Sequence, residues 1–187
     1  ILLEFGQPMH AFDYDKLQDK EIVIRTAKEG ETIETLMGDV VKLDTSNLVI
    51  ADSTKPIAIA GIMGGEDTKV TNSTKTILFE CANFNGPSIR TSSKKLGIMS
   101  DSSVKFTKGL DPNNIDMALD RAASLISEVG AGEIVKGVID NYPKKREPIE
   151  IPYDYEEINK FLGTNISKEQ MEDYFQRLEF KVDSTNN

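Results

Sequence analysis

Short runs of apolar residues alternate with polar turns through the first half of the chain. Gly30, Gly38 and Asn47 separate several of these runs, as turn residues typically do between strands. The runs are rich in β-branched residues and cover 22–25, 40–43, 48–51 and 76–79. The pattern therefore predicts a sheet. Segment 56–65 is apolar, small and glycine-rich, which lets the backbone approach another chain or a ligand closely.

Helical spacing of apolar residues begins further along the chain. Asp111 and Pro112 predict the start of a helix that carries apolar residues from Ile115 to Val129 and stops at Gly130. Two shorter helices are predicted later, over 155–162 and from the capping-box pattern at 167–170 onward. Three further short runs favour strands, at 137–140, 149–152 and 180–182.

The composition changes sharply at 143–148, a segment with two prolines and three basic residues. We expect a domain boundary there, which gives one domain over 1–145 and a second module over 146–187. Two short helices and an incomplete strand cannot bury much core, so we expect the second module to be truncated. The absence of an initial methionine and the polar last residues favour a piece of a larger protein.

Composition and charge limit the class of protein. With 187 residues, 39% hydrophobic and 28% charged, the chain is typical of a soluble globular protein. No apolar run approaches the roughly 20 residues of a membrane-spanning helix, and no signal peptide opens the sequence. A single cysteine excludes an internal disulfide and a CxxC metal site, which fits a reducing cytoplasm. The net charge of -9 argues against a surface that grips long nucleic acid.

The only histidine, His10, lies in segment 6–13, which is too irregular to be an ordinary strand or helix. Histidine changes charge near neutral pH, so His10 is the first candidate for acid/base chemistry. The alternative is a surface residue or a satisfied core residue. The usual motifs of nucleotide hydrolases, serine hydrolases and zinc hydrolases are absent. The glycines at 61–65 lack the lysine of a phosphate loop, which favours a tight turn.

Two other places offer chemistry, each with a structural alternative. Glu80 ends an apolar strand, where a carboxylate is either solvated at an edge or a buried acceptor, and spacing alone favours the solvated position. Cys81 beside it is expected to be a structural thiol. The hydroxyls of 100–103 precede a helix and could hold a polar ligand or make local capping bonds. Composition does not separate these two roles.

Four segments together resemble one family in order and spacing. They are 6–13 (GQPMHAFD), 58–65 (AIAGIMGG), 78–84 (LFECANF) and 101–112 (DSSVKFTKGLDP). Residues 1–145 thus resemble the B3/B4 region of the bacterial phenylalanyl-tRNA synthetase beta subunit. Residues 158–167 resemble the start of the B5 domain that follows. The resemblance implies an α+β fold, with an unusual β-sandwich layered against helices and then a truncated small α/β module.

The resemblance also implies a function. In that family the B3/B4 region edits: it hydrolyses tyrosine wrongly attached to tRNA(Phe), because a pocket for phenylalanine rejects an added hydroxyl only weakly. Glu80 matches the acceptor for the tyrosine hydroxyl, and His10 the histidine that orients the tRNA end or the attacking water. Gly64 lines the pocket by its backbone. Ser100 and Ser102 stand where relatives often have Thr and Ala around the amino acid.

Other implications concern the neighbouring residues and the partners. Lys105 and Lys108 stand where arginines are common in the family, and Thr107 replaces an acid. Lysine lacks the planar fork with which arginine makes a bidentate contact. The fragment is expected to need no cofactor or metal, whereas ATP and magnesium belong to the whole cytoplasmic enzyme. The partners implied are the acceptor end of tRNA(Phe) and the alpha subunit, in a heterotetramer of two alpha and two beta subunits, without a membrane.

Two alternatives to editing remain open. The first is a non-catalytic scaffold and tRNA-docking module of the same synthetase. Geometry separates it from editing, because a scaffold need not bring His10, Glu80, Gly64 and Ser100 around one cavity. The second is a free-standing esterase that uses His10 and Asp13, which is disfavoured because no nucleophile stands beside them.

Overall fold

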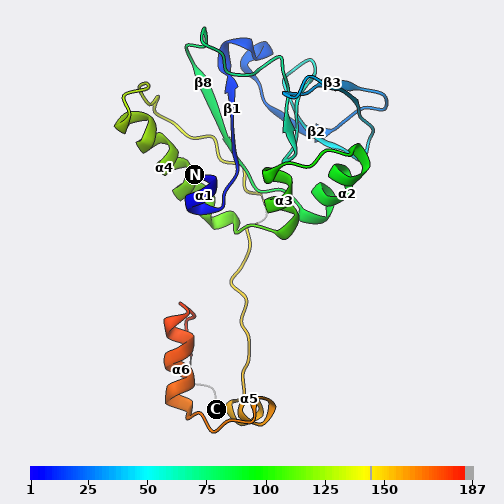
Figure 1. Ribbon diagram of the computed structural model, residues 1–187. Helices are drawn as coiled ribbons and strands as arrows, with labels where there is room; N and C mark the ends of the chain where they lie inside the picture. The colour runs from blue at the N-terminus through cyan, green and yellow to red at the C-terminus, as the bar shows by residue number, and fades with distance from the viewer. Residues whose placement is uncertain (144, 184–187) are drawn as a thin grey trace. The chain divides into compact units, whose positions relative to one another are not determined.

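The computed structural model describes residues 1–143 and 145–183 (Figure 1). The chain divides into two compact units, residues 1–136 and 137–187. Within the described residues, unit 1 contains eight strands and four α-helices. The helices are α1 (Leu2–Phe5), α2 (Gly86–Leu96), α3 (Asp101–Lys108) and α4 (Ile115–Glu128). Short 3-10 turns cover Tyr14–Lys16, Gln18–Lys20 and Pro112–Asn114. The α+β class expected from the resemblance is confirmed.

The described strands of unit 1 form three antiparallel sheets. The four-stranded sheet has the order β2 (Val23–Thr26), β5 (Leu48–Ala51), β6 (Pro56–Ile59), β7 (Met63–Gly64). A second sheet pairs β1 (Met9–Asp13) with β8 (Ile77–Cys81), and a third pairs β3 (Thr32–Glu34) with β4 (Val40–Lys42). Each of the four runs predicted from the sequence overlaps one of these strands, namely β2, β4, β5 and β8. The β-sandwich itself stays a prediction.

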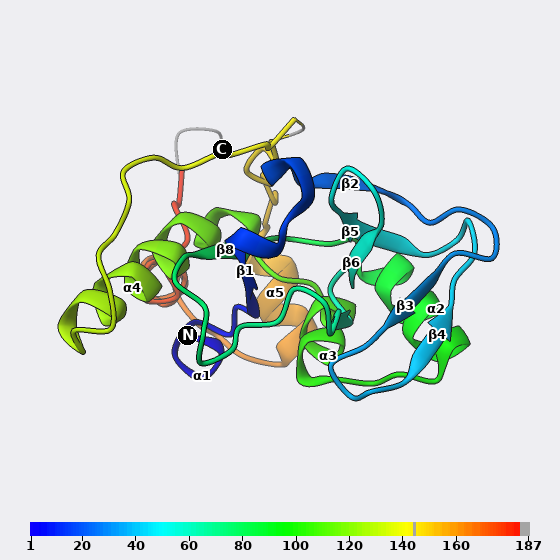
Figure 2. The ribbon, with the colours of Figure 1, turned by 90° about the horizontal axis from the view of Figure 1, so that it is seen from above.

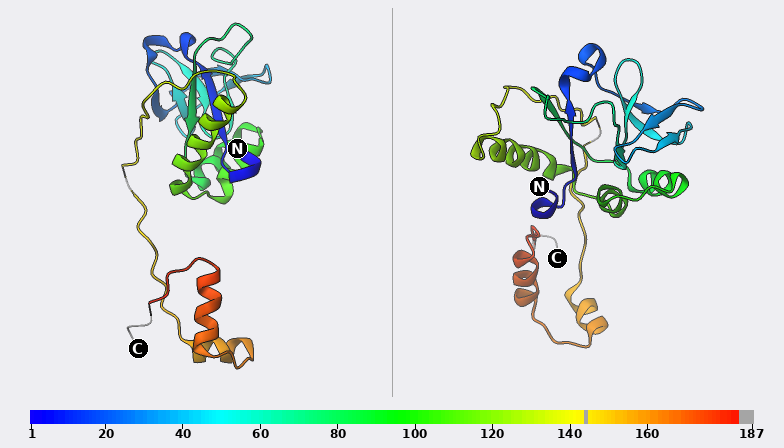
Figure 3. Two further views of the ribbon diagram at one scale, coloured as in Figure 1. Left: turned by 90° about the vertical axis from the view of Figure 1, so that its left-hand side faces the viewer. Right: turned by 45° about the horizontal axis from the view of Figure 1, so that its top comes forward.

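The strand β1 corrects one expectation directly. The segment around His10 was expected to be irregular, but Met9–Asp13 is a regular strand paired along its whole length with β8. Figures 1 and 3 show the two strands side by side although they are far apart in the chain. A strand needs a partner for its backbone hydrogen bonds, and here the partner follows in the chain only after six other strands.

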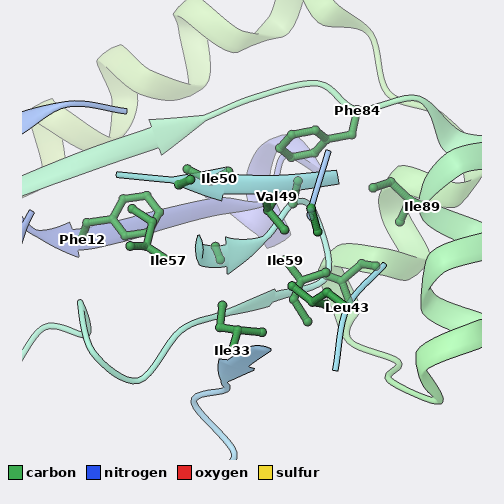
Figure 4. Packing of buried hydrophobic residues seen from close by; sticks show 14 of the residues in the cluster. Phe12, Ile33, Leu43, Val49, Ile50, Ile57, Ile59, Phe84 and Ile89 are labelled. Carbon is green, nitrogen blue, oxygen red and sulfur yellow. The ribbon is translucent and has the colours of Figure 1, made fainter. Parts of the chain in front are cut away.

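One hydrophobic core joins the sheets and the helices of unit 1. Phe12 of β1, Val49 and Ile50 of β5, and Ile57 and Ile59 of β6 are each at most 1% exposed (Figure 4). Phe84 and Phe106 close the same cluster beside α2 and α3, with ring centroids 4.9 Å apart. Helix α2 contacts α3, and α4 lies along β8 (Figure 2). The strands β1 and β6 and the helix α3 therefore pack on the same hydrophobic core.

Unit 2 contains two helices in its described residues, α5 (Tyr155–Leu162) and α6 (Lys168–Arg177). Both confirm the predicted helices: Asp154 caps α5, and Ser167 with Gln170 forms the expected capping box of α6. The strands expected at 137–140, 149–152 and 180–182 are wrong, because none of these described residues belongs to a strand. The expected boundary at 145/146 lies in the segment before α5 and stays a prediction.

No helix in the described part of the chain is long and apolar enough to cross a membrane.

Candidate active site

The β1–β8 pair places the two leading candidates directly opposite each other. His10 is the partner of Glu80 in the antiparallel register. Residues directly opposite in such a pair project from the same face of the sheet, with Cβ atoms about 5 Å apart. Two residues that are distant in the sequence thus become neighbours through one strand pairing.

A small cavity lies against this pair of residues. His10, Glu80, Gly64 and Ser102 line it, together with apolar side chains that include Met63 and Phe106. Its volume is about 60 Å³, which holds a few water molecules. A larger group enters only if lining side chains move. Four of the five residues predicted for the site therefore surround one cavity.

His10 contributes an unsatisfied polar atom to the site. Its Nε2 is buried and has no hydrogen-bond partner within the described residues. The imidazole packs edge-to-face on Phe12, with ring centroids 4.5 Å apart, and burial lowers its pKa below 6.5. The ring is therefore neutral at pH 7. A neutral imidazole can accept or donate a hydrogen bond at Nε2, depending on its tautomer.

Gly64 makes room for this imidazole. A Cβ atom built on Gly64 would lie 2.5 Å from Cε1 and 2.9 Å from Nε2 of His10, and 3.0 Å from Cδ1 of Leu36. These distances are shorter than van der Waals contact. The glycine is needed here for space and not for a left-handed backbone, since its φ lies outside the positive range.

Glu80 forms the opposite part of the site. The residue is partly buried, and burial raises the pKa of its carboxyl to about 7. The solvated edge position favoured by spacing is thus wrong. A carboxyl with this pKa is present in both protonation states at neutral pH, and both states carry an oxygen that can accept a hydrogen bond from a hydroxyl.

Cys81 does not belong to the cavity lining. Its thiol donates to the backbone carbonyl of Ile115 over 3.6 Å. Burial, assisted by the charges of Glu80 and Asp116, raises the pKa of the thiol to about 11. The protonated thiol packs against α4 and is unsuited to nucleophilic attack, as expected from the sequence.

Ser100 has a different place from the one predicted. It does not line the cavity; its Oγ accepts from the Ser103 amide at 3.1 Å and donates to the Ile62 carbonyl at 2.7 Å. Ser100 and Ser103 form the capping box that starts α3. Of the two roles left open for the hydroxyls of 100–103, capping is therefore the one that Ser100 fulfils. Only Ser102 lines the cavity.

We expect Ser100→Ala to lower the free energy of unfolding by about 1–2 kcal/mol, because α3 loses its N-cap and the Ile62 carbonyl loses a donor. Ser88→Ala in the first turn of α2 is the matched control, since Asn85 caps that helix. Chemical denaturation measures both variants. An equal decrease in the free energy of unfolding of the two variants would show that the Ser100 cap does not stabilise α3.

Sequence reasoning missed the apolar part of the lining, of which Met63 and Phe106 are two examples. Met63 lies inside the glycine-rich segment 56–65, and its position next to Gly64 could have indicated that it lines the cavity. Phe106 lies on α3, which the apolar pattern did not reveal. No group of His, Cys, Asp and Glu in the described residues could hold a metal ion.

Comparisons with known proteins identify the family of the chain. Residues 1–131 match the model of the B3/4 domain family. The chain is 50% identical over 98% of its length to the phenylalanine–tRNA ligase beta subunit of Clostridium acetobutylicum, and 44% identical over 97% to that of Bacillus subtilis. It spans 23% of the length of each of these relatives. The chain belongs to the B3/4 domain family and is similar to one segment of bacterial phenylalanine–tRNA ligase beta subunits.

Proposed function

We propose that this chain is the editing domain of a phenylalanine–tRNA ligase and hydrolyses tyrosine wrongly attached to tRNA(Phe). The observation that carries the proposal is the pairing of His10 and Glu80 across one cavity whose wall includes the backbone of Gly64. The names of the relatives supply phenylalanine and its tRNA, and tyrosine comes from the family resemblance. The site supplies the means to recognise one additional hydroxyl.

Glu80 carries the selectivity in this proposal. The tyrosine hydroxyl donates a hydrogen bond to the Glu80 carboxyl, which is partly buried and whose pKa is raised to about 7 by that burial. Phenylalanine would bury the same acceptor without a donor, and leaving a buried polar group unpaired costs about 1–3 kcal/mol. The aminoacylation site has to reject tyrosine instead, and an apolar pocket rejects an added hydroxyl only weakly. The two sites together discriminate better than either does alone.

His10 positions the reacting groups. Its unpartnered Nε2 offers a hydrogen bond to the attacking water or to the ribose at the tRNA end. Water attacks the ester carbonyl, the bond from the carbonyl carbon to the ribose oxygen breaks, and the ribose oxygen takes up a proton. Tyrosine and the uncharged tRNA are the products. The adjacent ribose hydroxyl assists as a proton relay.

The substrate needs more space than the unbound cavity has. Methionine is unbranched and adapts its conformation readily, so movement of Met63 is the simplest way to admit the tyrosine ring. The apolar wall that includes Ile59 and Phe106 then packs against the ring. The remaining tRNA contacts come from outside this chain, since its net charge is -9.

The chain thus acts as a part of a larger cytoplasmic enzyme. The beta-subunit name of its relatives implies an alpha subunit, and we propose a heterotetramer of two alpha and two beta subunits. The acceptor end of tRNA(Phe) reaches the editing cavity, whereas ATP and magnesium are used at an aminoacylation site elsewhere. Residues 146–187 form the start of the B5 domain.

The experiment that tests the proposal uses the complete synthetase with His10→Ala. We expect hydrolysis of tyrosyl-tRNA(Phe) to fall at least about 100-fold, because the attacking water or the ribose loses the group that positions it, while phenylalanine activation is unchanged. Deacylation of preformed tyrosyl-tRNA and amino-acid-dependent pyrophosphate exchange measure the two activities. If the wild-type enzyme does not deacylate tyrosyl-tRNA, the scaffold and tRNA-docking function is the correct one.

A further inference from the structure

Gln7 is a buried polar residue beside the site that the sequence did not single out. The residue is 1% exposed. The amide Nε2 donates to two backbone carbonyls, to Pro8 over 2.9 Å and to Ala82 over 2.8 Å. Pro8 precedes β1 and Ala82 follows β8. The side chain of Gln7 therefore ties together the ends of the two strands that carry His10 and Glu80.

The strand register explains why a side chain is needed at this point. The Tyr14 amide donates to the Thr76 carbonyl over 2.9 Å, so these opposite residues form a hydrogen-bonded pair just beyond the other end of the sheet. Hydrogen-bonded and non-hydrogen-bonded pairs alternate along an antiparallel ladder. His10 with Glu80 is therefore a hydrogen-bonded pair, and the next such pair is Pro8 with Ala82.

At that next pair the ladder lacks a donor. The amide of residue 8 would donate to the Ala82 carbonyl, but proline has no N–H. Nε2 of Gln7 donates to this carbonyl instead. We infer that Gln7 is a positioning residue: its side-chain amide replaces the missing backbone donor and holds β1 against β8 where His10 faces Glu80. What the pair then does rests on the proposed function, whereas the positioning does not.

The single histidine allows this inference to be tested without any activity assay. The chain contains one imidazole, so its Cε1–H resonance in an NMR spectrum of the 187-residue protein reports on His10 alone. Gln7→Met keeps the length of the side chain but donates no hydrogen bond. We expect the resonance to move and its titration midpoint to rise toward 6.5, because the strand ends separate and water reaches the ring.

Two further variants separate positioning from general damage. Asn83→Leu removes another side-chain donor near the end of β8, which binds the Leu110 carbonyl over 2.9 Å and lies outside the cavity. We expect Asn83→Leu to leave the His10 resonance unchanged. Pro8→Ala restores a backbone N–H opposite Ala82, so in the Gln7→Met background it should return the resonance toward its wild-type position. Should Gln7→Met not fold, Gln7→Asn tests the same displaced donor more gently.

In the complete synthetase, we expect Gln7→Met to lower deacylation of tyrosyl-tRNA about 10- to 100-fold, as a misplaced catalytic geometry does. The loss should lie in kcat more than in KM, because Gln7 contacts neither the water nor the amino acid. An unchanged His10 resonance in Gln7→Met, or Pro8→Ala that gives no recovery, would overturn the inference. If wild-type enzyme lacks deacylation but the resonance depends on Gln7, only the proposed function is wrong.

Discussion

Gly64→Ala is expected to reduce hydrolysis of tyrosyl-tRNA(Phe) about 100-fold while the domain remains folded. The added methyl group would lie 2.5 Å from Cε1 of His10, so the imidazole must leave its place opposite Glu80. The backbone of Gly64 is not strained by the change, since its φ is ordinary. The stability loss should stay within the roughly 1–3 kcal/mol typical of overpacking.

Two other glycines serve as controls for this variant. Gly132 also has an ordinary φ, and a Cβ there would meet Cγ2 of Ile126 at an unstrained 3.8 Å, so Gly132→Ala should change neither activity nor stability. A Cβ on Gly65 would lie 2.5 Å from the Ile57 carbonyl oxygen, a backbone atom that cannot move aside. Gly65→Ala should therefore destabilise the sheet, whereas Gly64→Ala should act mainly on the site.

A double variant identifies the atom responsible. In a His10→Ala background the imidazole is absent, and a methyl group on Gly64 then meets only Leu36 closely. The stability loss from Gly64→Ala should shrink in that background, which is a positive coupling between two residues in contact. Chemical denaturation of the four proteins measures this coupling. Additive losses would show that the two residues do not compete for the same space.

The elements predicted correctly are those whose signals lie within a few residues of one another. The apolar residues within 155–162, and Ser167 with Gln170 at the start of α6, are local patterns, and both helices form where they indicate. The apolar spacing of Ile115–Glu128 likewise predicts α4, with only a 3-10 turn inserted after Asp111. Local hydrogen bonds suffice to define these helices.

The site could not be predicted in the same way, because it depends on distant partners. The regular strand structure of β1 and the partial burial of Glu80 cannot be predicted from neighbouring residues. Both depend on the pairing of β1 with β8, which are distant in the sequence. The four family motifs supplied that information as a resemblance. Of the residues they indicate, His10, Gly64 and Glu80 line one cavity, whereas the hydroxyl of Ser100 caps the start of α3.

The wrong and missing elements have physical causes as well. β-branched residues at 137–140 and 149–152 favour strands, but no described strand pairs with them, and an unpaired strand is not stable. Helices α2 and α3 were missed because serine and lysine dominate them. One or two apolar contacts, such as Ile89 and Phe106, hold each of them to the core, too few for a periodic pattern.

Glu80→Gln is expected to stabilise the protein relative to the wild type, and to do so more at pH 8 than at pH 4. The pKa of the Glu80 carboxyl is raised from 4.5 to about 7 in the folded state, so the folded protein keeps a proton that the unfolded chain releases. The stability that Glu80 contributes is complete below pH 4.5, falls as the pH rises to about 7, and stays low above it. The full change is about 3 kcal/mol.

Glutamine does not ionise, so the variant escapes this loss. Its advantage over the wild type should grow by about 3 kcal/mol between pH 4 and pH 8, as measured by chemical denaturation at both values. Glu133→Gln is the control, because Glu133 is exposed and its replacement should act equally at the two pH values. If the two variants depend on pH alike, burial does not raise the pKa of Glu80 in the folded protein.

The same residue should decide between tyrosine and phenylalanine. Glu80→Met has a similar length but no acceptor, so the preference of the complete synthetase for hydrolysing tyrosyl-tRNA over phenylalanyl-tRNA should fall about 100-fold. Glu80→Gln retains an acceptor oxygen and should keep part of the preference. If the Glu80 carboxyl were needed only for folding, its replacement would slow the hydrolysis of tyrosyl-tRNA and phenylalanyl-tRNA equally. A loss confined to the tyrosyl ester, in a variant with unchanged phenylalanine activation, requires Glu80 to contact the hydroxyl by which the two amino acids differ.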